Sequence, residues 1–118
     1  MDRYSVSVEE RDPARFVVTV VGELDLSQAD DLGSRLDALI RPGGIVALDA
    51  TDLTFMDSTG LRVLLQATAH AAARGAGFRL VAPQAAVLRV LELSGTASIV
   101  DMRQDIADGL TALTAPAE

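Results

Sequence analysis

Cysteine is absent from the 118-residue sequence, which excludes disulfides, a thiolate nucleophile and cysteine-ligated zinc. Lysine is absent too, so chemistry that needs a lysine amine is excluded and all 10 basic residues are arginine. Aromatic residues make up 3% of the chain, so the core must be aliphatic. No apolar run approaches the roughly 20 residues of a membrane-spanning helix. The N-terminal segment shows no signal-peptide pattern, so we expect a cytoplasmic protein.

Acidic residues outnumber basic ones by 17 to 10, giving a formal net charge of -7. Such a surface repels phosphate backbones, so a general nucleic-acid binder is not expected. The hydrophobic share of 49% is typical of a folded protein, and the length suits one domain. We therefore predict a single domain over residues 1–113, followed by a short disordered tail at 114–118.

The hydrophobic pattern predicts two strands followed by alternating helices and strands. Alternation over 4–9 and β-branched residues over 16–21 indicate an antiparallel hairpin joined by a turn at 11–14. Further strands are expected at 45–49, 78–82 and, weakly, 98–100. Helical periodicity marks four segments. The first is capped by Ser27 with Asp30, and the second opens with the residues around Ser58. The third contains Leu88, and the fourth contains Ile106, Leu110 and Leu113.

This order predicts an α/β layer fold with a mixed, mainly parallel sheet, an antiparallel N-terminal edge hairpin and about four helices. Right-handed crossovers place the loops after successive parallel strands at one edge of the sheet. Ligands and partners of open parallel sheets are met at that edge. Segments 23–28, 55–60 and 83–85 should therefore be neighbours.

The segment Asp57-Ser58-Thr59-Gly60 combines a carboxylate and two hydroxyls at the start of a helix. Helix capping alone explains such residues, each contributing about 1 kcal/mol. Three polar residues exceed what one cap requires, however. Gly60 in the first turn costs roughly 1 kcal/mol relative to alanine, and a glycine there allows another backbone to approach closely.

A serine at a helix start is a good phosphate acceptor, because free N–H groups and the helix dipole stabilise an added anion. Phosphorylation of Ser58 would preserve the fold and add about 1.5 to 2 negative charges beside Asp57. A docked partner would have to desolvate them, so a binding switch is favoured. Asp25 lies on the same edge. Its carboxylate either interacts favourably with the dipole of the helix that follows, or binds a partner arginine, or does both.

Catalytic sites are not supported by the pattern. His70, the only histidine, lies 12 residues beyond Ser58 on the same helix, about 18 Å away, so no Ser-His pair can form. Asp49 lacks the lysine that a phospho-accepting receiver site needs. The remaining acidic pairs have no histidine or cysteine support, so we expect no metal, cofactor or catalytic activity.

Several landmarks resemble the STAS-domain family, specifically bacterial anti-sigma factor antagonists. The likeness runs from Ser5 to about Leu110, and the Asp-Ser-Thr-Gly element is its most specific feature. The other landmarks are Gly22-Glu23-Leu24-Asp25, Val81-Ala82-Pro83 and Val90-Leu91-Glu92-Leu93-Ser94-Gly95.

The resemblance implies a partner-switching cycle. The unphosphorylated chain would bind an anti-sigma factor serine kinase and release the sigma factor, phosphorylation at Ser58 would end the interaction, and a metal-dependent serine phosphatase would reset it. The residues implied in partner binding are Asp25, Asp57, Ser58, Thr59 and Gly60, with Leu61 and Arg62 added by proximity. The free protein would be a monomer or weak dimer. The alternative is a scaffold subunit of a signalling or transport assembly, in which Ser58 has only a structural role.

Overall fold

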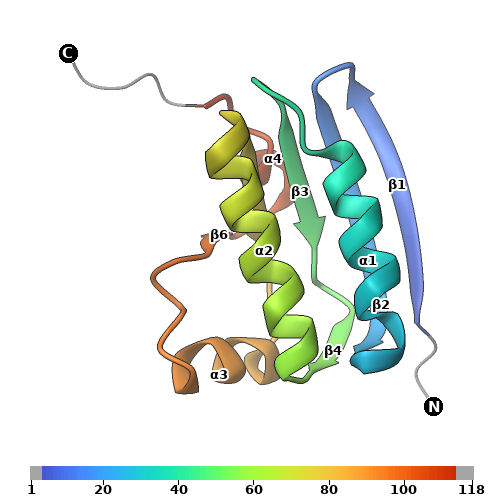
Figure 1. The fold of residues 1–118 in the computed structure, drawn as a ribbon, viewed down its shortest axis with the longest axis vertical. Helices are drawn as coiled ribbons and strands as arrows, with labels where there is room; N and C mark the ends of the chain where they lie inside the picture. The colour runs from blue at the N-terminus through green and yellow to red at the C-terminus, as the bar shows by residue number, and fades with distance from the viewer. Residues whose placement is uncertain (1–3, 114–118) are drawn as a thin grey trace.

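The computed structural model describes residues 4–113, which form one mixed sheet with four helices (Figure 1). The strands run in the order β1-β2-β3-β5-β6, and β4 pairs only with β2. The β1-β2 pair is antiparallel and the other pairs are parallel, as the sequence predicts. The elements are β1 (Ser5–Asp12), β2 (Arg15–Leu24), α1 (Leu26–Leu39), β3 (Ile45–Asp49), β4 (Leu53–Met56), α2 (Ser58–Arg74), β5 (Gly77–Val81), α3 (Ala85–Leu93), β6 (Asp101–Arg103) and α4 (Ile106–Gly109).

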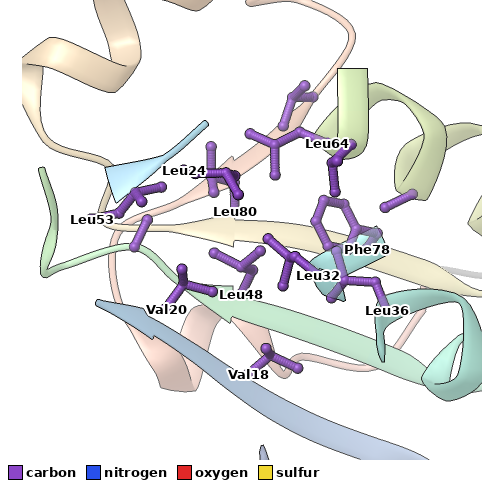
Figure 2. Close-up of a cluster of buried hydrophobic side chains, with 14 of the residues drawn as sticks. Val18, Val20, Leu24, Leu32, Leu36, Leu48, Leu53, Leu64, Phe78 and Leu80 are labelled. Atoms are coloured by element: carbon purple, nitrogen blue, oxygen red, sulfur yellow. The ribbon is translucent and has the colours of Figure 1, made fainter. Parts of the chain in front are cut away.

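The main core lies between the sheet and the helix pair α1 and α2, which pack side by side (Figure 1). Leu32 and Leu36 of α1 and Leu64 of α2 gather with Leu48 and Phe78 of the sheet (Figure 2). These side chains are buried, and most of the cluster is leucine, valine and alanine. The predicted aliphatic core is therefore present.

The opposite face of the sheet carries α4 and the segment after it. Gly109 faces Ala47 and Val81, whose side chains point away from the main core because successive strand residues alternate. Arg79, which is 4% exposed, reaches across from β5 and donates from Nη1 to the carbonyl oxygens of Gly109 (2.9 Å) and Thr111 (2.8 Å). The buried Arg79 guanidinium thus holds the segment around Gly109 and Thr111 against the sheet.

The last elements differ from the sequence prediction. The prediction of a strand at 98–100 is wrong. The edge strand is β6, where Asp101 and Arg103 pair in register with β5. The final helix ends at Gly109, short of Leu113, because Arg79 binds carbonyl groups there that a longer helix would use. Strand β4 was not predicted. The tail prediction for 114–118 lies outside the described residues.

Among the helices of residues 4–113, none has the length and apolar character needed to cross a membrane.

Candidate functional site

The candidate site forms where β2 and β4 end side by side. Leu24 and Met56 pair in the parallel register, and the N–H of Asp57 donates to the carbonyl oxygen of Leu24 at 3.3 Å. Each strand is followed at once by a helix, so α1 and α2 begin at the same end of the molecule (Figure 1). Segments 23–28 and 55–60 are therefore neighbours, as the sequence predicts.

The third predicted segment, 83–85, joins the same region through a different contact. Gln84 donates from Nε2 to the carbonyl oxygen of Thr51 at 2.6 Å, just before β4, and α3 packs against β4. The segment therefore supports the strand that leads into α2.

The start of α1 is capped by Asp25. Its Oδ1 accepts from the N–H of Ser27 at 2.9 Å, while the Gln28 side chain accepts from the N–H of Asp25 at 3.3 Å. The capping box predicted from Ser27 and Asp30 is therefore wrong by two residues. Asp25 has the extended backbone of a cap residue at the end of β2, so the helix begins at Leu26.

Asp57 caps α2 with a single carboxylate oxygen. Its Oδ1 accepts from the N–H groups of Thr59 (2.9 Å) and Gly60 (3.1 Å) and from the Thr59 hydroxyl (2.5 Å). The Thr59 hydroxyl bond is the main cause that lowers the pKa of Asp57 below its ordinary value, with smaller contributions from the backbone N–H donors. Capping thus accounts for both Asp57 and Thr59.

Gly60 is required by close packing of the strand end beneath it. A Cβ atom at this position would lie 2.7 Å from Met56 Cγ, 2.8 Å from the Leu24 carbonyl oxygen and 2.9 Å from Leu24 Cγ. The close backbone approach that a glycine allows is therefore present, and the approaching group is the carbonyl of Leu24.

Ser58 is the first residue of α2 and is exposed. Within residues 4–113 its hydroxyl makes no hydrogen bond, whereas both neighbouring side chains are used by the cap. The fold therefore leaves this hydroxyl exposed to solvent.

The two following residues differ in exposure. Leu61 is half-buried and packs against the core, so much of its side chain supports α2. Arg62 is exposed and lines a groove of about 670 Å³ between α1 and α2. The groove is lined by Ala29, Asp30, Gly33, Ser34, Asp37, Arg62, Val63 and Gln66.

Two large apolar side chains at this edge are exposed, which the sequence pattern does not predict. Leu26 is 71% exposed and Phe55 is 46% exposed, and Phe55 pairs in register with Glu23 near the end of β2. The available signal was the position of Leu26, directly after a capping aspartate and outside the apolar stripe that begins at Ala29. The exposure of Phe55 follows from β4, which the pattern did not predict.

Other candidate groups lie elsewhere. His70 is on the far half of α2, where its Nδ1 lies 3.2 Å from Asp37 Oδ1 of α1, so it does not meet Ser58. No three histidine or acidic side chains of residues 4–113 come together in an arrangement that could hold a metal ion. The site at the helix starts is thus a surface of hydroxyl, carboxylate and apolar groups.

A mixed sheet with two capped helix starts at the ends of its parallel strands places this chain among the α/β domains. The STAS domain model matches residues 5–109, and the chain belongs to that family. The resemblance inferred from the sequence is confirmed.

Relatives named as anti-sigma factor antagonists are similar over most of the chain. The anti-sigma-B factor antagonist of Listeria monocytogenes is 27% identical over 100 residues, covering 84% of this chain and 88% of the relative. The crystal structure of an anti-sigma factor antagonist from Mycobacterium paratuberculosis has a TM-score of 0.77 at 25% identity and covers 91% of each chain. The anti-sigma factor antagonist SpoIIAA in its unphosphorylated form shares the fold, with a TM-score of 0.71 at 20% identity over 85% of this chain and 89% of that one.

Proposed function

We propose that this protein is an anti-sigma factor antagonist controlled by phosphorylation of Ser58. The unphosphorylated form binds a kinase-type anti-sigma factor and thereby releases the sigma factor. Phosphorylation ends the interaction, and a metal-dependent serine phosphatase restores it. The antagonist acts by binding and needs no cofactor of its own.

The observation that carries this proposal is the unused hydroxyl of Ser58. Asp57 and Thr59 complete the helix cap, and Gly60 admits the Leu24 carbonyl, so structural needs account for three residues of the motif. They leave Ser58 exposed and without a hydrogen bond in the described chain. A role outside the fold explains why a hydroxyl stands there.

The chemistry requires only an accessible oxygen. Ser58 Oγ attacks the γ-phosphorus of ATP held by the kinase, the new O–P bond forms, ADP leaves, and the hydroxyl proton passes to a base of the kinase. Hydrolysis by the phosphatase returns the hydroxyl and releases inorganic phosphate. Both steps leave the cap of α2 intact, because Asp57 provides it.

The surroundings of Ser58 suit a protein partner. Leu26 and Phe55 supply exposed apolar area at the same edge, and apolar anchors carry much of the affinity of protein interfaces. Asp25 uses Oδ1 for its cap, and its other carboxylate oxygen has no hydrogen bond within residues 4–113, so it can accept from a partner arginine. A phosphate placed among these groups would have to be desolvated in the complex, which costs a few kcal/mol and lowers affinity a hundredfold or more.

Capture of the cognate anti-sigma factor tests the proposal. Ser58→Asp and Ser58→Glu should lower capture strongly, while Ser58→Ala should bind constitutively and accept no label from the kinase and ATP. Circular dichroism should stay unchanged for all three variants. Equal capture by the wild type and the acidic variants, with labelling absent from the wild type, would instead favour a scaffold subunit that does not switch.

A further inference from the structure

Arg62 is a free cation one helical turn beyond Ser58. It is exposed and has no ion pair within residues 4–113. Arg89 is the other arginine of the described chain without a partner, because Arg41 lies over the ring of Phe16 and the rest are paired. The paired arginines are Arg11, Arg15, Arg35, Arg74, Arg79 and Arg103.

Helix geometry brings Arg62 toward Ser58. Residues at positions i and i+4 lie on the same stripe of a helix, with Cβ atoms about 5–6 Å apart. The Cα–Cβ bonds also tilt toward the helix N-terminus, so the Arg62 side chain can reach back over the first turn of α2. An acidic group followed by a cation at i+4 is the more favourable order of the pair.

The carboxylates near Arg62 do not engage it. Asp30 and Asp37 of α1 line the same groove, but neither lies within ion-pair distance of the guanidinium. Asp37 is held by Arg74 at 2.6 Å and lies 3.2 Å from His70. Arg62 is therefore available to a new anion on its own helix.

We propose that Arg62 is the internal partner of the phosphate on Ser58, donating two guanidinium N–H groups to two phosphate oxygens. This inference rests on the proposed function, which supplies the phosphate. Pairing would give phosphorylation two effects on the docking surface, because it adds an anion and also withdraws a cation that faces the partner. It would also favour the dianionic form of the phosphate, the form that is most costly for a partner to desolvate.

The test uses the full chain with phosphoserine incorporated at position 58 during translation, so it does not depend on the kinase. Phosphorus NMR follows the second ionisation of the phosphate in this protein and in its Arg62→Gln and Arg89→Gln variants. The cation favours the dianion, so Arg62→Gln should move the midpoint up by about 0.15–0.4 pH unit. Arg89→Gln should leave it unchanged. Coupling between the guanidinium nitrogen and phosphorus should be present in the parent and absent in Arg62→Gln.

Equal midpoints for the parent and Arg62→Gln, with no such coupling in the parent, would overturn the inference. Capture of the anti-sigma factor by the same samples tests the proposed function separately. If capture survives phosphorylation while the midpoint moves, the Arg62 contact stands and the switch fails. If capture is lost while the midpoint is unchanged, the switch stands and the Arg62 contact fails.

Discussion

The starts of α1 and α2 are built alike and used differently. Each follows a parallel strand, and each is capped by an aspartate in extended backbone, Asp25 and Asp57. The next residue is an exposed leucine in α1, Leu26, and an exposed serine in α2, Ser58. Because the cap residue meets the structural need, the residue after it is free to make contacts outside the fold. The first helix start offers apolar area and the second offers a hydroxyl.

The largest expected difference between the two helices concerns their glycines. Gly60→Ala should destabilise the protein by about 1–3 kcal/mol, because its Cβ would collide with the Leu24 carbonyl, which already accepts from Asp57. Gly33→Ala in α1 meets nothing within 4 Å and should stabilise by roughly 0.5–1 kcal/mol. Urea denaturation measures both values. A loss of stability in Gly33→Ala comparable to that in Gly60→Ala would remove the proposed distinction.

The apolar start of α1 is tested next. Leu26→Ala should lower affinity for the anti-sigma factor about tenfold, as expected for a buried interface anchor. Its stability should stay within about 0.5 kcal/mol, because the side chain is 71% exposed. Leu93→Ala is the matched control, since that leucine is 77% exposed and is the last residue of α3. Calorimetric titration checks the affinities, and equal affinity for Leu26→Ala and wild type would show that the leucine is not an anchor.

Removing either cap should have a smaller effect on stability. Asp25→Ala and Asp57→Ala should each cost about 1 kcal/mol, because each leaves first-turn N–H groups without an acceptor. Asp57→Asn keeps an oxygen acceptor and should lose less. Thermal unfolding followed by circular dichroism ranks the stabilities of these variants. Unchanged stability in Asp57→Ala would mean that the cap is unimportant to α2.

The pH dependence of stability is the smallest expected effect. Hydrogen bonds from Thr59 and Gly60 lower the pKa of Asp57 in the folded state, so its contribution is complete above the ordinary aspartate pKa. That contribution is lost as the pH falls through the lower, folded-state pKa. Urea midpoints between pH 6 and pH 2 should therefore fall less steeply in Asp57→Asn than in the wild type. Parallel curves would contradict this account.

Sequence periodicity located most of the helices and strands, because the spacing of apolar residues reflects which side chains each element buries. Strand β3 matches its predicted bounds, and α2 begins within the predicted segment 57–60. Strand β4 has four residues and pairs only with the end of β2, so its pattern is too short to be seen alone. The edge strand β6 owes its position to its pairing with β5, which no local pattern encodes.

Some features of the candidate site likewise follow from the sequence, and others follow from the tertiary structure. Sequence alone determined which groups are present, namely an acidic cap, a serine behind it and a glycine within one turn of helix, because helix starts follow local rules. Tertiary structure decided that Asp25 and Asp57 lie at adjacent helix starts, since only the pairing of β2 with β4 joins segments distant in the chain. It also decided that Leu26 and Phe55 remain uncovered and that Gly60 meets the Leu24 carbonyl, because exposure and close contact depend on what the rest of the fold places nearby.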